Sequence, residues 1–160
     1  MRRVMVICVG RMKERFYAGA AAEYIKRLSR YCKLEIVELP EQRLPENPVP
    51  AGIRRALAKE AEAIRAKLPP SSAVAAMCIE GELRSSEGMA RLLDDAAAGG
   101  EKCLVFLVGG SFGLDEGLKK EAWVRLSMSP MTFPHHLARV MLLEQIYRGF
   151  QINEGGKYHK

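Results

Sequence analysis

Short apolar runs alternate with segments of helical period along this chain, and this alternation limits the fold more than any other feature. The predicted strands are 3–9, 34–39, 73–79, 103–108 and 123–128. The predicted helices are 14–30, 51–68, 85–98, 115–121 and 134–150. Strands that alternate with helices imply an α/β fold with a mainly parallel sheet. Because no linker or repeat interrupts the pattern, we expect a single domain over residues 1–160.

Two of the predicted strands end in loops that allow a ligand to approach the backbone closely. The run 102–108 is followed by the segment 109–113, Gly-Gly-Ser-Phe-Gly, and the run 123–128 by the segment 129–134, Ser-Pro-Met-Thr-Phe-Pro. In an open parallel sheet, ligands bind at the carboxyl ends of the strands. No Gly-Lys-Ser/Thr follows and no G-x-G-x-x-G is present, which argues against a P-loop and a dinucleotide fingerprint. The segment 40–50 has four prolines and is expected to be a loop, and 81–84 is expected to turn.

Charge and composition narrow the class of protein and its partners. A net charge of +6 and a pI near 9.3 favour a polyanionic partner, although a solvated basic surface would give the same values. No apolar run approaches the roughly 20 residues of a membrane span. The charged start leads directly into a strand, so we expect no signal peptide, no membrane partner and a cytoplasmic location. The cysteines at 8, 32, 78 and 103 lack metal-type spacing and are expected to pack as small apolar side chains.

The last predicted helix is apolar around most of its circumference. A helix of this kind is buried on more than one side, whereas a small domain has one sheet face to offer it, so we predict a homodimer. Arg139 lies on the apolar side, where it needs a partner, an anionic ligand or a route to solvent at an interface. Glu144 and Arg148 form either an i,i+4 ion pair or an RNA contact in which Glu144 orients the arginine.

The histidines and the charged C-terminal segment are further candidates for chemistry. Side chains of the adjacent His135 and His136 diverge by about 100° on a helix, which suits shared ligation poorly, so we predict no metal site. Tyr158 can stack on a base while neighbouring cations pair with phosphate, although such a tail is normally disordered. The sequence has no Ser-His-Asp constellation and no G-x-S-x-G elbow, which argues against a hydrolase.

Several of these segments together resemble the SPOUT-class methyltransferases, and most closely the ribosomal RNA large subunit methyltransferase H family. The matching segments are 106–110, 126–135, 139–140 and 144–148, and the resemblance extends from 6–10 to 158–160. It implies a C-terminal trefoil knot, S-adenosyl-L-methionine held in loops of the knotted region, and a homodimer with the substrate site near the subunit boundary. It also implies methylation of N3 of a pseudouridine in 23S rRNA on assembled ribosomes.

The resemblance assigns roles to individual residues. The cofactor would contact eight of them: Met77 at the end of the third predicted strand, Gly109, Met128, Ser129, Pro130, Met131, Thr132 and Phe133. Met77 stands where the family often has leucine, and Lys157 where relatives often have proline.

The candidate catalytic residues are Arg139, Tyr158 and His159, with Tyr158 stacking or positioning the base and His159 as the candidate general base. Cations near a uracil-type base favour its N3 anion. Arg148, Lys157 and Lys160 are the RNA-binding candidates. Two alternatives stay open: a non-catalytic RNA-binding or ribosome-assembly protein, and a SPOUT methyltransferase that acts on tRNA.

Overall fold

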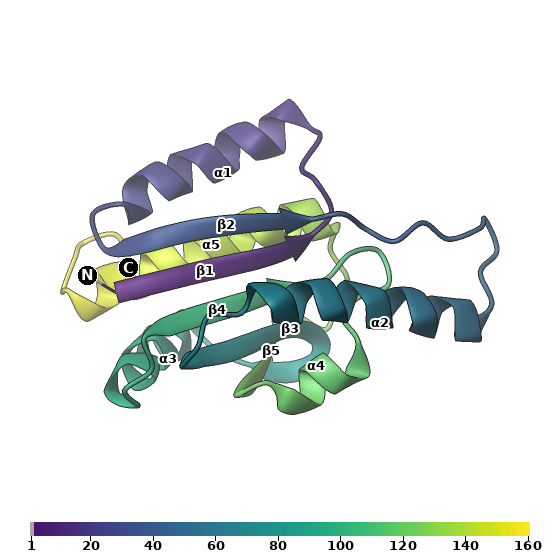
Figure 1. The fold of residues 1–160 in the computed structure, drawn as a ribbon. Helices are drawn as coiled ribbons and strands as arrows, with labels where there is room; N and C mark the ends of the chain where they lie inside the picture. The colour runs from purple at the N-terminus through teal and green to yellow at the C-terminus, as the bar shows by residue number, and fades with distance from the viewer. Residues whose placement is uncertain (1) are drawn as a thin grey trace.

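The computed structural model describes residues 2–160 and is built on a five-stranded sheet in the order β2-β1-β4-β3-β5 (Figure 1). The strands are β1 (Arg2–Val9), β2 (Cys32–Leu39), β3 (Ser72–Leu83), β4 (Cys103–Val108) and β5 (Val124–Ser127). All four strand pairings are parallel. Strand β4 and most of β1 are buried, as continuous apolar runs are when helices cover both faces of a sheet. The predicted α/β fold with a parallel sheet is confirmed.

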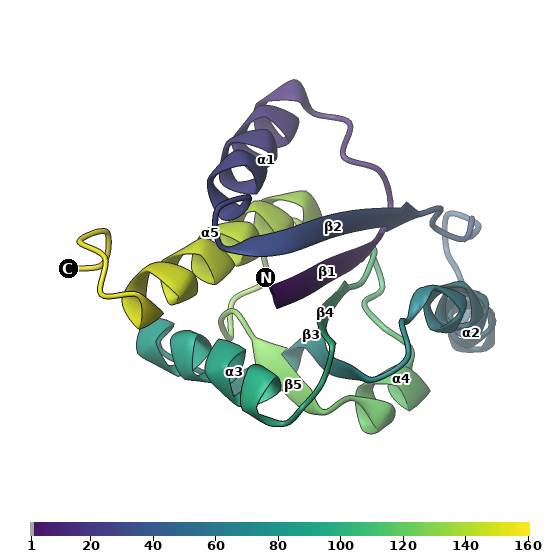
Figure 2. The ribbon, with the colours of Figure 1, turned by 60° about the vertical axis from the view of Figure 1, so that its left-hand side comes forward.

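Five helices cover the two faces of the sheet. They are α1 (Arg15–Leu28), α2 (Pro50–Lys67), α3 (Ser86–Ala98), α4 (Glu116–Glu121) and α5 (His135–Asn153). Helices α1, α3 and α5 lie on one face, and α2 and α4 lie on the other (Figure 2). Alternate side chains of β1 therefore enter two separate cores, with Val4 and Val6 in one and Met5 and Ile7 in the other. None of the helices within residues 2–160 is both long and apolar enough to cross a bilayer.

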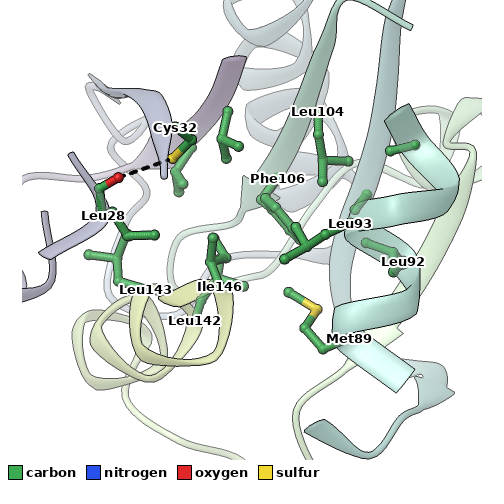
Figure 3. Close-up of a cluster of buried hydrophobic side chains, with 14 of the residues drawn as sticks. Leu28, Cys32, Met89, Leu92, Leu93, Leu104, Phe106, Leu142, Leu143 and Ile146 are labelled. Atoms are coloured by element: carbon green, nitrogen blue, oxygen red, sulfur yellow. Dashed lines mark hydrogen bonds between the residues drawn. The ribbon is translucent and has the colours of Figure 1, made fainter. Parts of the chain in front are cut away.

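The larger core explains why α5 is apolar on several sides. Its side chains Leu142 and Ile146 are fully buried together with Leu28 of α1, Leu93 of α3 and Phe106 of β4 (Figure 3). Helix α5 packs against both α1 and α3, so two helices of the same chain cover flanks that the sequence argument left to a second subunit. Apolarity around the helix is therefore not sufficient evidence for a dimer.

Strand β3 differs from its prediction. The segment 81–84 was expected to turn, but β3 continues to Leu83, and its register against β5 shifts so that Met77 and Glu82 both lie opposite Leu126. Gly81 makes this possible, because a Cβ there would lie 2.7 Å from the backbone nitrogen of Leu126. Met77 consequently lies inside the strand, next to a bulge, rather than at its end.

Two helix starts also differ slightly from their predictions. Helix α3 begins at Ser86 rather than at Ser85, because Ser85 is its N-cap, with a hydroxyl that accepts a hydrogen bond of 3.0 Å from the backbone N–H of Gly88. Pro134, expected in the first turn of the last helix, is the N-cap residue of α5.

Candidate functional site

The loops that follow β4 and β5 form a cavity of about 570 Å³ together with the middle of β3. Seven of the eight predicted cofactor contacts line it, all except Pro130: Met77, Gly109, Met128, Ser129, Met131, Thr132 and Phe133. A cavity of this size suits a small-molecule ligand. The structure thus brings together residues that lie on three separate segments of the chain.

The glycine segment after β4 is folded back on itself at the cavity. The backbone N–H of Gly113 donates to the carbonyl oxygen of Gly110 over 3.1 Å, and Gly113 has a φ of +79°. A Cβ on Gly109 would overlap the backbone of Gly113, so only glycine fits there. The glycines of this loop therefore line the cavity with backbone peptide groups and not with side chains.

The segment after β5 is shaped by its own serines. Ser127 Oγ donates to the carbonyl oxygen of Ser129 over 3.0 Å, and the N–H of Met131 donates to Ser129 Oγ over 3.0 Å. This turn sets Met131 and Phe133 at the cavity. Apolar walls beside free peptide groups can hold a flat heteroaromatic ring and recognise its polar edge.

A second cavity, of about 520 Å³, lies on the other side of Met77 and Met128, which line both cavities. Its polar lining includes Ser86 of α3 and Gln145 of α5. Ser86 Oγ donates to Gln145 Oε1 over 2.9 Å, and Gln145 Nε2 donates to a carboxylate oxygen of Glu144 over 2.7 Å. A chain of polar groups therefore runs along this second cavity.

The C-terminal segment contacts α5 beside the second cavity. Arg148 donates to Glu144 Oε1 from Nε at 2.9 Å and from Nη2 at 2.6 Å, which confirms the predicted ion pair. The guanidinium lies 4.6 Å from the ring centroid of Tyr158, whose hydroxyl donates to the same oxygen over 3.1 Å. The tail that was expected to be disordered is thus held by hydrogen bonds and cation–π contact.

His159 is held at both ring nitrogens. Nδ1 lies 3.2 Å from Arg148 Nη1 and Nε2 lies 2.8 Å from Glu87 Oε1. Because a guanidinium only donates, Nδ1 is assigned as the acceptor and Nε2–H as the donor to Glu87, which is the neutral tautomer. Lys157 and Lys160 are exposed at the same end of the chain.

The surroundings of these groups change their protonation. Burial, together with the nearby Glu144 carboxylate, raises the pKa of Tyr158 to about 12, so this phenol stays a hydrogen-bond donor at neutral pH. Hydrogen bonds from its own backbone N–H and from His159 lower the pKa of Glu87. The cluster therefore presents a neutral phenol between charged groups.

Arg139 lies apart from this cluster. It is 3% exposed, lines neither cavity, and donates from Nη1 to Glu38 Oε2 at 2.6 Å and from Nη2 to the carbonyl oxygen of Gly10 at 3.0 Å. The partner that the sequence argument required is thus a carboxylate at the end of β2. These contacts hold α5 against the ends of β1 and β2, and they do not bring Arg139 to Tyr158 or His159.

Sequence reasoning missed the carboxylates that accept hydrogen bonds from Arg139 and His159. Glu38 is 101 residues from Arg139 in the chain, and Glu87 is 72 residues from His159. No local pattern marks such pairs, because they form only when the sheet brings distant segments together.

Known proteins match this chain along its whole length. The family described as "Predicted SPOUT methyltransferase" matches residues 2–159. The "Ribosomal RNA large subunit methyltransferase H" of Pelotomaculum thermopropionicum is 44% identical over 159 residues, which are 99% of this chain and 99% of that protein. The protein of the same name from Levilactobacillus brevis is 43% identical over 157 residues, 98% of this chain and 99% of its own.

Among solved structures, a match is described as "The structure of a probable methylase family protein from Haemophilus influenzae Rd KW20". It superposes with a TM-score of 0.56 at 13% identity, over 99% of this chain and 71% of that one. At this identity the likeness supports the fold alone.

Proposed function

The chain belongs to the SPOUT methyltransferase family, and we propose that it methylates N3 of a pseudouridine in 23S rRNA on assembled ribosomes, with S-adenosyl-L-methionine as methyl donor. It is a methyltransferase, and the relatives that are 43% and 44% identical to it carry the name of a large-subunit rRNA methyltransferase. The observation that carries the cofactor site is the gathering of seven expected contacts around one cavity. Residues 1–160 act as one such domain, with the C-terminal trefoil knot that the family resemblance implies.

The cavity between the β4 and β5 loops fits the cofactor in size and chemistry. Met77, Met128 and Phe133 offer apolar surface to an adenine ring, and Gly109 and Gly110, which have no side chains, let the edge of the ring approach the backbone. When bound, S-adenosyl-L-methionine supplies an electrophilic methyl group on a sulfonium. The protein's part is to hold the two reactants in line, which accounts for most of the expected rate gain.

The target N3–H must lose its proton before the nitrogen can attack. Arg148, Lys157 and Lys160 place positive charge at the C-terminal end of the chain, and positive charge favours the imide anion. His159 is the candidate to accept the proton, for which Nδ1 must exchange its bond from Arg148 for one from the base. Tyr158 is protonated at neutral pH, so it stacks on or positions the target nucleobase and does not accept its proton.

A second copy of the chain covers the outer side of α5 and places the substrate site near the subunit boundary. Val140 and Met141 of α5 and Tyr24 of α1 support this arrangement, because they line the second cavity and are only partly buried in one copy. This cavity adjoins the cofactor cavity across Met77 and Met128. The dimer works in the cytoplasm on ribosomes, without a metal or a membrane partner. Light scattering tests the dimer, because it measures the mass of the protein in solution.

The decisive experiment is mass spectrometry of rRNA from cells that lack this protein. We expect one methyl group to be missing from a pseudouridine of 23S rRNA and to return with the intact gene. Unchanged rRNA would contradict the proposal. In vitro, methyl transfer to assembled ribosomes but not to free 23S rRNA or tRNA distinguishes it from the tRNA alternative.

Calorimetry with S-adenosyl-L-methionine distinguishes the methyltransferase from a non-catalytic RNA-binding protein, because the latter would give no heat of binding. In the same assays we expect His159→Ala to reduce methylation more than cofactor binding. An equal loss of both would contradict the role of His159 in proton transfer.

A further inference from the structure

We infer that Glu41 is a positioning residue for the cofactor cavity, because its carboxylate fixes the glycine segment that lines the cavity. Glu41 does not line the cavity itself and acts through Gly110 and Ser111, which do. The inference rests on the proposed function, since it assigns a residue to the same cavity. Neither the motifs nor the family resemblance pointed to Glu41.

The contact between Glu41 and the glycine segment is short and specific. The backbone N–H of Ser111 donates to Glu41 Oε1 over 2.7 Å, the length of a charge-assisted hydrogen bond. The same carboxylate packs on Gly110, where a Cβ would lie 2.7 Å from Oε1 and 2.9 Å from Cδ. The absence of a side chain at Gly110 thus leaves the space that the Glu41 carboxylate occupies, and this carboxylate accepts a hydrogen bond from the N–H of Ser111.

The backbone on both sides of Glu41 is fixed by hydrogen bonds. Just before it, the carbonyl oxygen of Leu39 accepts a bond of 2.7 Å from the N–H of Gly10 at the end of β1. Just after it, the N–H of Gln42 donates over 2.8 Å to Oε2 of Glu60, a buried side chain of α2. The segment that the sequence showed only as a proline-rich loop therefore presents one carboxylate in a fixed place.

The physical benefit of this contact is pre-organisation. Glycine loses more conformational freedom on ordering than other residues, so a segment with three glycines among residues 109–113 is costly to keep in one shape. The hydrogen bond that Ser111 donates to Glu41 orders the loop before the ligand binds, so less of the binding free energy is lost in ordering it. Removal of Glu41 is then expected to weaken cofactor binding more than it weakens the fold.

The test compares Glu41→Ala, Glu41→Gln and Glu46→Ala, the last being an exposed glutamate of the same loop. For each full-length protein, calorimetry gives the Kd for S-adenosyl-L-methionine, and NMR of the ligand-free protein gives the hydrogen-exchange protection of the Ser111 amide. We expect Glu41→Ala to raise the Kd about tenfold, as for loss of one hydrogen bond to a charged group, and to remove the protection. Glu41→Gln is expected to keep part of both, because its amide oxygen accepts a weaker, uncharged hydrogen bond, and Glu46→Ala changes neither.

A milder variant guards against loss of folding. Glu41→Asp keeps the charge but retracts the carboxylate by one methylene, and we expect it to weaken binding and protection in the same direction. Unchanged Kd and unchanged Ser111 protection in Glu41→Ala or Glu41→Asp would overturn the inference. Failure of the unmodified protein to bind S-adenosyl-L-methionine would instead overturn the proposed function, and the inference with it.

Discussion

Replacing Glu38 by glutamine tests how far the buried Arg139 depends on a charged partner. Breaking a fully buried ion pair by removing one charge costs about 3–5 kcal/mol. Arg139 is 3% exposed, but the Glu38 side chain is 37% exposed, so water can solvate part of the site. The glutamine oxygen also still accepts a hydrogen bond. We therefore expect Glu38→Gln to lower the free energy of unfolding by about 2 kcal/mol.

Urea unfolding measures this loss, and a second glutamate of β2 provides the matched control. With a denaturant dependence of about 2 kcal/mol per molar urea, the midpoint is expected to fall by about 1 M. Glu35 pairs with Arg3 at 3.3 Å with side chains 51% and 45% exposed, so Glu35→Gln is expected to cost about 0.5 kcal/mol or less. Equal losses in the two variants would refute the argument that burial of the arginine sets the cost.

The same pair gives a pH dependence of known sign. Burial alone would raise the pKa of Glu38, but the hydrogen bonds from Arg139 and from the N–H of Met12 outweigh it and lower the pKa from 4.5. A lowered pKa in the folded state means that the stabilisation is present above the unfolded value and is lost as pH falls through the folded value. The difference between wild type and Glu38→Gln is therefore expected at neutral pH and to shrink in acid, below about pH 4. A difference that stays the same from neutral pH into acid would contradict this.

Three further outcomes follow from particular contacts. Gly109→Ala places a Cβ in the facing loop backbone, so calorimetry is expected to show loss of cofactor binding, whereas Gly19→Ala, with open space around it, leaves binding unchanged. Ser85→Ala removes the cap of α3 and is expected to lower the free energy of unfolding by about 1 kcal/mol in urea; no change would show that the cap is dispensable. Tyr158 is expected to ionise near pH 12, measured as the part of the ultraviolet titration that disappears in Tyr158→Phe. Because its folded pKa is raised, its contribution to stability is present below about pH 10 and is lost as pH rises toward 12; ionisation near pH 10 would show that the phenol is not buried beside Glu144.

Local patterns were enough to predict most of the elements. Strand β4 has its predicted bounds, Cys103–Val108, because six consecutive apolar residues end at a glycine pair. Strand β3 was predicted too short, since the feature that lets it continue is the close approach of Gly81 to Leu126 on another strand. Periodicity and chain breakers describe neighbours in sequence, and they carry no information about such approaches.

The sequence by itself predicted the parallel α/β architecture and, through its family motifs, seven residues that line the cavity between the β4 and β5 loops. Only the tertiary structure decided which carboxylates hold that arrangement: Glu38 on Arg139, Glu41 on the glycine loop and Glu87 on His159. An apolar run specifies its own burial, because burial depends on the side chain and its period. An ion pair or hydrogen bond depends on a distance of about 3 Å between two chosen atoms, and that distance exists only after the chain has folded.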